Sequence, residues 1–516
     1  MDERIDAALK LLPDYLGQHV VLSACALALG TAISLPLAVA AARSPRLRWP
    51  VLALASLIQT IPGLALLALF YPLLLGLSQL TLKAFGVAVP ALGFLPSLLA
   101  LTLYALLPIL RNATAGLIGV DPAIVEAADG VGMTRSQRLW KVEAPLAAPV
   151  VMAGVRTAAV WTIGAATLST PVGQTSLGNY IFAGLQTENW VFVLFGCAAA
   201  AVLAMATDQL LGLIEAGAAR RDRRRVLAGL IGLLAGTALA IAPLLHAAPK
   251  SYVVGAKNFS EQFILASIID GKLQAAGASV QRKDGLGSAV VFRALQAGDI
   301  DVYVDYSGTL WTNVLGRTDS PSREVMLSVL TRQLKDRYGV VLLGPLGFEN
   351  AYALAMRGER ARALGVASLD DLTRAAPSLK LGGDLEFLSR PEWTAIRTAY
   401  GLKFGRQASF NPTFMYRALE SGQADVISAF SSDGRIAADR LVVLSDPRHA
   451  IPAYDAVILI SPRRAGDRRL RAALQPLIGR IGVERMREAN LMVDRDADKR
   501  SPEQAAAWLE QATGLR

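Results

Sequence analysis

The feature that most constrains this chain is a series of long apolar runs that ends near residue 246. A membrane helix needs about 20 mainly apolar residues to cross roughly 30 Å of hydrocarbon. Beyond residue 246 the apolar runs shorten and charged residues become dense, so the first part of the chain belongs in lipid and the second in water. The segments long enough to be spans are 18–42, 51–79, 89–110, 147–170, 188–215 and 226–246.

Basic residues indicate which way these spans run, because cytoplasmic loops of membrane proteins are enriched in Arg and Lys. The basic connections alternate with connections that carry almost no positive charge. The basic ones therefore share the cytoplasmic side, and everything after residue 246 faces outward. They contain Arg43, Arg46 and Arg48 after the first span, Arg111, Arg135, Arg138 and Lys141 after the third, and Arg220, Arg221, Arg223, Arg224 and Arg225 after the fifth.

The formal charge of +10 has the same explanation. Clustered Lys and Arg can neutralise nucleic-acid phosphates, but here the most basic run lies between two apolar spans, so we expect no nucleic-acid partner. Cys25 and Cys197 both lie inside apolar runs, which argues against a disulfide or a metal site. The three histidines, His19, His246 and His449, match no catalytic or metal-ligand spacing. We expect no cofactor and no enzymatic activity.

These patterns divide the chain into an all-α polytopic membrane domain over 1–225, a sixth span and tether over 226–250, and an outer domain over 251–516. The sixth segment has a second interpretation, because a basic run, an apolar stretch and His246-Ala247-Ala248-Pro249 also describe a cleavable signal peptide. We favour a retained span, since the apolar stretch approaches spanning length.

The outer domain shows short β-branched runs, such as Tyr252-Val253-Val254-Gly255, that alternate with helical stretches such as 262–274. That alternation predicts an α/β fold with parallel strands. The same pattern repeats after about residue 345. We therefore expect two α/β lobes with a cleft between them, lobe 1 over 251–345 and 452–516 and lobe 2 over 346–451.

The connection between the third and fourth spans contains a motif with a family resemblance. Glu126-Ala127-Ala128 is followed after three residues by Gly132, and Val142 and Pro145 complete the pattern. This resembles the EAA loop of ATP-binding-cassette importers, a short helix that docks on the ATPase subunit. The resemblance implies a permease with a cytoplasmic ATPase partner. No Gly-x-x-x-x-Gly-Lys-Ser/Thr phosphate loop occurs in the sequence, so ATP must be hydrolysed by another polypeptide.

The outer domain carries its own resemblance, in four motifs that occur in the expected order. It is similar to the glycine betaine, carnitine and choline binding proteins of osmoprotectant importers. Fused permease and binding domains also occur in that group, including transporters of ergothioneine. The resemblance implies a periplasmic-binding-protein fold and a quaternary ammonium ligand. The motifs are Lys257–Gln262, Asp301–Thr309, Gly347–Leu354 and Asp425–Ile436.

A trimethylammonium head has no N–H to donate, so aromatic faces must hold it, and each contact contributes roughly 0.5–2 kcal/mol. By resemblance, Tyr306, Tyr352 and Phe430 are the cage candidates, and Tyr303, Tyr416 and Tyr454 are weaker ones. Polar candidates for the other end of the ligand are Gln262, Thr309 and Ser431. Arg390 can pair with a ligand carboxylate bidentately, although an ordinary ion pair explains it equally well.

The expected protein is a multi-pass component of the bacterial inner membrane, with its carboxy-terminal domain in the periplasm. We expect a homodimeric permease served by a separate ATPase that imports a quaternary ammonium compound. Glycine betaine, choline, carnitine and ergothioneine are all candidate cargoes. The alternative is a membrane sensor that binds a ligand without transporting it, but the EAA-like loop has no role in such a protein.

Overall fold

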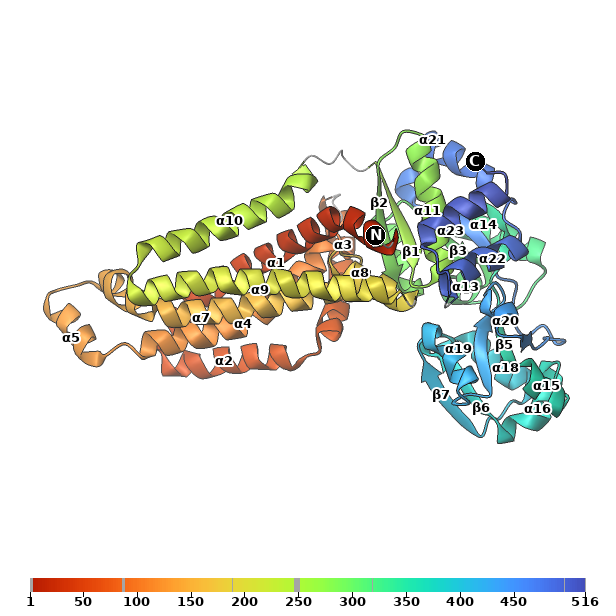
Figure 1. The fold of residues 1–516 in the computed structure, drawn as a ribbon, viewed down its shortest axis with the longest axis horizontal. Helices are drawn as coiled ribbons and strands as arrows, with labels where there is room; N and C mark the ends of the chain where they lie inside the picture. The colour runs from red at the N-terminus through yellow and green to blue at the C-terminus, as the bar shows by residue number, and fades with distance from the viewer. Residues whose placement is uncertain are drawn as a thin grey trace. The chain divides into compact units, whose positions relative to one another are not determined.

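The computed structural model describes residues 3–85, 89–187, 189–245, 251–317, 319–495 and 497–515. The chain forms two compact units (Figure 1). The first contains Met1–Gly184 and Trp190–Ala248, and the second contains Leu185–Asn189 and Pro249–Arg516. The possible cleavage sequence His246-Ala247-Ala248-Pro249 lies outside the described residues.

The first unit is helical. Five of its described helical runs are long and apolar enough to cross a membrane: Ile5–Arg43, Phe94–Ile118, Arg135–Val172, Trp190–Arg220 and Arg223–Leu245. Its helices are α1 (Glu3–Arg43), α2 (Pro45–Thr60), α3 (Gly63–Phe85), α4 (Phe94–Ile118), α5 (Pro122–Gly130), α6 (Arg135–Arg138), α7 (Ala144–Ala166), α8 (Gly178–Gln186), α9 (Trp190–Arg220) and α10 (Arg223–Leu245).

The expected second span, 51–79, is not one straight helix. It is the pair α2 and α3, which are bent by 101° at a short break. Ile61 at the end of α2 is extended, with φ −72° and ψ 126°, because the ring of Pro62 disfavours helical backbone in the residue before it. The unit thus has five candidate spans, or six if the bent pair counts as one.

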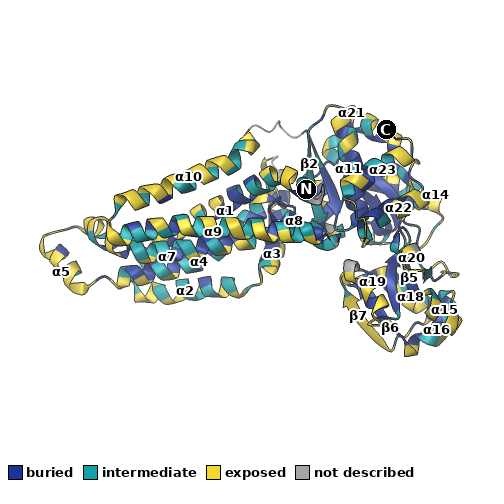
Figure 2. Cartoon of the chain, in the orientation of Figure 1, coloured by how far each residue is buried: buried dark blue, intermediate teal, exposed yellow. Residues whose placement is uncertain are grey.

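Small residues bring the central helices together. A side chain at Gly154 of α7 would lie under 3.0 Å from Asn112 and from the Pro108 carbonyl of α4, so glycine permits the close packing that membrane helices favour. Ala105 and Ala158 are buried at the same interface. Much of α10 is exposed, as its yellow segments in Figure 2 show. Its exposed side chains include the large apolar Leu234 and Leu239, as expected of a surface that faces lipid.

The second unit contains two five-stranded sheets with strand orders β2-β1-β3-β10-β4 and β7-β6-β8-β5-β9. In the first sheet the strands are β1 (Tyr252–Lys257), β2 (Val280–Leu286), β3 (Val302–Tyr306), β4 (Val341–Glu349) and β10 (Asp455–Ile460). In the second they are β5 (Tyr352–Arg357), β6 (Lys380–Asp384), β7 (Arg406–Phe410), β8 (Val426–Phe430) and β9 (Leu441–Val443). We call the part built on the first sheet lobe 1 and the part built on the second sheet lobe 2.

The strands are parallel only in part. β1 pairs in parallel with β2 and β3, and β6 with β7 and β8. β10 runs antiparallel to β3 and β4, and β5 runs antiparallel to β8 and β9. The expectation of parallel strands is therefore wrong for β4, β5, β9 and β10. These are the strands next to the two crossings, 350–351 and 444–454, where the chain passes between the sheets.

Helices cover both sheets. Their buried faces form one large core cluster with the strands, in which Ile264, Leu372 and Ile458 are fully buried. The helices are α11 (Ser260–Ala275), α12 (Ser288–Ala297), α13 (Ser307–Thr309), α14 (Arg323–Tyr338), α15 (Gly358–Leu364), α16 (Leu369–Ala375), α17 (Leu385–Ser389), α18 (Pro391–Tyr400), α19 (Pro412–Glu420), α20 (Arg435–Ala438), α21 (Arg468–Leu474), α22 (Val483–Asp494) and α23 (Pro502–Ala512).

Candidate ligand-binding site

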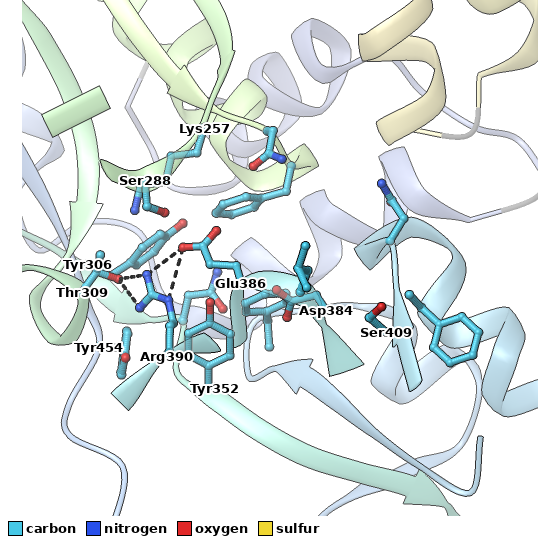
Figure 3. Close-up of a pocket in the computed structure, with 17 residues that line it drawn as sticks. Lys257, Ser288, Tyr306, Thr309, Tyr352, Asp384, Glu386, Arg390, Ser409 and Tyr454 are labelled. Carbon is cyan, nitrogen blue, oxygen red and sulfur yellow. Dashed lines mark hydrogen bonds and ion pairs between the residues drawn. The ribbon is translucent and has the colours of Figure 1, made fainter. Parts of the chain in front are cut away.

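A cavity of about 390 Å³ lies between the two lobes (Figure 3). Small-molecule sites typically measure roughly 300–1,000 Å³, so it suits a compact ligand. Both lobes contribute to its lining, which consists of Lys257, Asn258, Phe259, Ser288, Tyr306, Thr309, Asn350, Tyr352, Asp384, Leu385, Glu386, Arg390, Ser409, Phe410, Asn411, Phe430 and Tyr454.

Strand ends place most of these side chains. Tyr306 ends β3, Asp384 ends β6 and Phe430 ends β8, and in α/β sheets ligands bind beyond the carboxyl ends of the strands. Tyr352 begins β5 and pairs directly with Phe430 across the antiparallel β5–β8 ladder. Residues that are directly opposite project from the same face of a sheet, so both rings point into the cavity.

Five aromatic rings of the lining contact one another across the lobes. The Phe259 ring of lobe 1 stacks on the Phe430 ring of lobe 2, with centroids 6.0 Å apart and planes within 5°. Phe259 also stacks on Tyr306 at 6.2 Å, and Tyr352 lies 5.1 Å from Phe430 and 5.8 Å from Tyr454. The lobes therefore stand close enough here to assemble one aromatic wall from both.

Gly308 allows the Tyr454 ring to approach this wall. A Cβ at Gly308 would lie under 3.0 Å from three atoms of that ring. The hydroxyl of Tyr454 donates a hydrogen bond to Glu392. Glycine in the Tyr-Ser-Gly-Thr stretch is thus required by close packing and not by its backbone angles.

Two cations already stand near the aromatic faces. Lys257 Nζ lies 5.1 Å from the centre of the Tyr306 ring, and its charge is matched by Asp305, 2.5 Å away. The Arg390 guanidinium lies 5.2 Å from the centre of the Tyr352 ring. The Tyr306 and Tyr352 rings thus each make a cation–π contact with a side chain of the protein itself.

Arg390 is only 5% exposed and is held by neighbouring carboxylates. It donates to Glu386 at 2.8 Å and to Glu392 at 3.2 Å, and it lies 3.5 Å from Thr309 Oγ1. Dashed lines in Figure 3 mark its contacts with Glu386 and Thr309. Burial raises the pKa of Glu386, but the charges of Arg390 and Lys257 outweigh it, so this pKa lies below its ordinary value. Glu386 is 42% exposed and is the accessible partner of the pair.

Asp384 adds a second carboxylate to the lobe 2 side of the cavity. It caps α17 by accepting a hydrogen bond from the Phe387 amide at 2.8 Å, and Ser428 donates to it at 3.3 Å. Burial raises the pKa of Asp384 above its ordinary value. The cavity thus combines aromatic faces with carboxylates, which is the environment that a cation without N–H groups prefers.

The structure brings together five of the eight predicted ligand residues. Tyr306, Thr309, Tyr352, Arg390 and Phe430 all line the cavity, as does the weaker candidate Tyr454. These residues therefore border the same cavity, and their contact with a ligand stays a prediction.

The other predicted residues lie outside the cavity lining. Gln262 accepts from the Lys257 amide and donates to the Tyr306 hydroxyl at 2.9 Å, so its amide positions a pocket residue. Tyr416 lies on α19 in a separate core cluster, with Arg435 3.9 Å from its ring. The Ser431 hydroxyl accepts from the Ala351 amide at 2.9 Å. The weaker candidate Tyr303 is fully buried and donates to Asp305 at 2.5 Å.

Several lining residues were not predicted from the sequence. Phe259 and Asn350 lie within the quoted motifs, but the sequence predicts no role for them, although an aromatic ring two residues after a strand, as at Phe259, is an available signal. Asp384 and Glu386 have no such signal, because they are the cap and the first turn of α17, where acidic residues commonly serve only to stabilise a helix. Phe410 ends the edge strand β7, and nothing in its sequence context marks it.

The loop between α4 and α7 has the form of a short capped helix. Asp121 caps α5 by accepting from the Ala123 amide at 2.9 Å, and Gly132 closes it with a φ of +78°, a conformation that favours glycine. Of the predicted docking residues, Glu126, Ala127, Gly132 and Pro145 are exposed, and Ala128 is buried. The exposed residues lie where a partner subunit can reach them.

Apolar spans joined to a two-lobed domain with an interlobe cavity define a class of protein, the binding-protein-dependent importers. Residues 250–511 match the substrate binding domain of ABC-type glycine betaine transport systems. Residues 32–220 match the inner membrane component of binding-protein-dependent transport systems. The chain belongs to these families and is the fused permease and substrate-binding domain of an ABC importer, which confirms the predicted fold class and the predicted location in the membrane.

Individual relatives match either most of the chain or one of its two parts. The ergothioneine transport permease/ergothioneine binding protein EgtU of Helicobacter pylori is 28% identical over 90% of this chain and 83% of its own length. The choline transport system permease protein OpuBB of Bacillus subtilis is 36% identical over 38% of this chain and 84% of its own length. A solved glycine betaine/carnitine/choline ABC transporter structure is 24% identical, with a TM-score of 0.45 over 51% of this chain and 98% of its own.

Proposed function

We propose that the interlobe cavity binds a quaternary ammonium compound, with its trimethylammonium head against Tyr306, Tyr352 and Phe430. The observation that carries this proposal is the convergence of aromatic rings from both lobes on one cavity that also contains Asp384 and Glu386. A methylated ammonium cannot donate hydrogen bonds, so ring faces and nearby carboxylates are its main sources of affinity. Three ring contacts at roughly 0.5–2 kcal/mol each give useful binding.

The polar end of the ligand faces Thr309 and Arg390 in this proposal. Arg390 is occupied by Glu386, so a carboxylate-bearing ligand must compete with Glu386 for the guanidinium. Choline, which has no carboxylate, leaves that pair intact. Glycine betaine, choline, carnitine and ergothioneine remain the candidate cargoes, and the family and the named substrates of the relatives support this set.

The complete importer follows from the same reasoning. We expect a homodimer of the permease, since one chain supplies one permease half, and two copies of a separate ATPase. These dock at the loop that contains Glu126, Ala127, Ala128, Gly132 and Pro145. The cargo crosses unaltered, because ATP hydrolysis takes place on the partner subunit.

The division into 1–225, 226–250 and 251–516, with lobes 251–345 plus 452–516 and 346–451, stays a prediction. The same holds for retention of the sixth span. Immunoblotting a chain tagged at its carboxy terminus tests retention of the sixth span, because a fragment of about half the mass is expected only if the chain is cut after that span.

Calorimetry of the purified full-length chain against glycine betaine, choline, carnitine and ergothioneine tests the binding site. We expect saturable binding of at least one compound and weaker binding after Tyr352→Ala. A matched control is Tyr338→Ala, because Tyr338 packs on Phe292 of lobe 1 and is not among the residues that line the cavity. Absence of binding by all four compounds would contradict the proposal.

A further inference from the structure

Glu261 is a buried acidic residue that is not among the residues lining the cavity. It lies in the first turn of α11 and is 3% exposed. Its Oε1 accepts hydrogen bonds from the Tyr306 hydroxyl at 2.5 Å and the Asn350 amide at 3.0 Å. Its Oε2 accepts from the Ser432 hydroxyl at 2.6 Å and the Asn490 amide at 2.9 Å.

All four partners are neutral groups that donate to Glu261. This set fits an ionised carboxylate, which accepts hydrogen bonds and donates none. Burial raises the pKa of Glu261 above its ordinary value, and the hydrogen bonds from Ser432, Tyr306, Asn490 and Asn350 offset only part of this rise. The first turn of a helix also favours negative charge. Burying a carboxylate costs free energy unless it is fully hydrogen-bonded, so the arrangement depends on all of its donors.

The donors come from different parts of the unit. Tyr306 ends β3 and Asn490 lies on α22, both in lobe 1, whereas Asn350 lies in the first crossing between the sheets. Ser432 follows β8 in lobe 2. One carboxylate therefore connects lobe 1, a crossing and lobe 2.

The contact with lobe 2 is a close one. Asn490 also donates to the Ser432 carbonyl at 3.0 Å, and Arg487 of α22 donates to the Ser431 carbonyl at 2.8 Å. A side chain at Gly434 would lie under 3.0 Å from the Leu491 side chain of the same helix. The segment after β8 thus rests on α22, and the bond between Ser432 and Glu261 lies inside this contact.

The other end of the connection is a wall of the cavity. The Tyr306 hydroxyl donates to Glu261 and accepts from Gln262, which fixes the ring that lines the cavity. In the same arrangement of the lobes, Phe259 of lobe 1 stacks on Phe430 of lobe 2. The bonds of Glu261 and the assembled aromatic wall therefore occur together.

We propose that Glu261 is a positioning residue that favours the arrangement of the lobes in which the aromatic wall is assembled, by accepting hydrogen bonds from Tyr306 and Ser432 at once. Its consequence for affinity rests on the proposed function. If only the assembled arrangement binds, the apparent dissociation constant is the intrinsic one divided by the assembled fraction. Loss of the Ser432 bond then weakens all ligands by the same factor, whereas pocket variants change ligands differently.

The decisive variant is Ser432→Ala, since it removes one hydrogen bond of Glu261 and leaves the bond from Asn490 to the carbonyl of residue 432 in place. The matched control is Ser421→Ala, because the Ser421 hydroxyl in lobe 2 donates only to the nearby Ala418 carbonyl among the contacts described. Glu261→Gln is the direct variant, which keeps the shape and removes the charge.

Spin labels report the arrangement of the lobes in the full-length chain. They are placed by Arg332→Cys on α14 and Arg374→Cys on α16, after Cys25→Ser and Cys197→Ser. Without added ligand, we expect Ser432→Ala and Glu261→Gln to broaden the interlobe distance distribution, and Ser421→Ala to leave it unchanged. A distribution for Ser432→Ala that coincides with the control overturns the inference, even if the variant melts at a lower temperature.

Calorimetry with choline and ergothioneine gives the second readout. We expect Ser432→Ala to raise both dissociation constants by the same factor, roughly three- to tenfold. In a Tyr306→Phe background the factor should be smaller, because the hydrogen bonds from Tyr306 and Ser432 share the Glu261 carboxylate. The inference is contradicted if Ser432→Ala weakens choline and ergothioneine by different factors, or if its effect is the same with and without Tyr306→Phe. If the unmodified chain binds neither compound nor the other two candidates, the proposed function fails, and the distance measurement still decides the role of Glu261.

Discussion

Phe430→Leu is the change that most clearly separates an aromatic cage from an ordinary apolar pocket. Leucine keeps much of the apolar volume and removes the ring face, which lies between Phe259 at 6.0 Å and Tyr352 at 5.1 Å. Losing one cation–π contact costs roughly 0.5–2 kcal/mol. Since about 1.4 kcal/mol corresponds to a tenfold change, the dissociation constant for choline is expected to rise about 2- to 30-fold.

The assay compares choline with 3,3-dimethylbutanol, its neutral isostere, by calorimetry on the full-length chain. Only the cation gains from the ring quadrupole, so binding of the neutral compound is expected to change little. Phe404→Leu is the matched control, because Phe404 packs against Trp393 at 6.2 Å and does not line the cavity. Equal losses for the two compounds would refute the electrostatic role of the ring.

Three further predictions concern charge and the ATPase loop. Arg390→Lys is expected to weaken glycine betaine about tenfold more than choline, because Lys cannot form the bidentate pair with a carboxylate; calorimetry checks the ratio. The pKa of Glu386 is depressed by folding, so its contribution to stability is present above the unfolded pKa and is lost as pH falls through the folded pKa. The melting temperature of Glu386→Gln should therefore fall less than that of the unmodified chain below about pH 4. Gly132→Ala forces a side chain into a φ of +78°, at a cost of roughly 1–2 kcal/mol, and should reduce uptake of labelled choline but not its binding.

The sequence was most informative where a residue lies in a motif with a family resemblance. Tyr306 and Tyr352 were predicted by such a resemblance, and they stand at the end and the start of strands that meet at the cavity. Apolar length and basic loops likewise predicted the membrane region. The break at Ile61–Pro62 shows the limit of that reasoning, because hydropathy continues through a bend that one proline creates.

Predicting the roles of the remaining candidate residues requires knowing where their side chains point. Gln262 and Tyr306 are neighbours in the fold, yet the amide of Gln262 points to the Tyr306 hydroxyl and not to the cavity. Tyr416 lies on α19, whose packing directs its ring toward Arg435. Which face of a helix or strand looks into a cleft depends on packing between lobes, and no local pattern in the sequence records that packing.

The position of a bound trimethylated cation tests the account most directly. Arsenocholine replaces the nitrogen of choline with arsenic, which gives an anomalous signal in crystals of the protein. The account predicts one arsenic peak inside the cavity, within about 6 Å of the ring centres of Tyr306, Tyr352 and Phe430. A peak elsewhere in a saturated crystal, with this cavity empty, would contradict it.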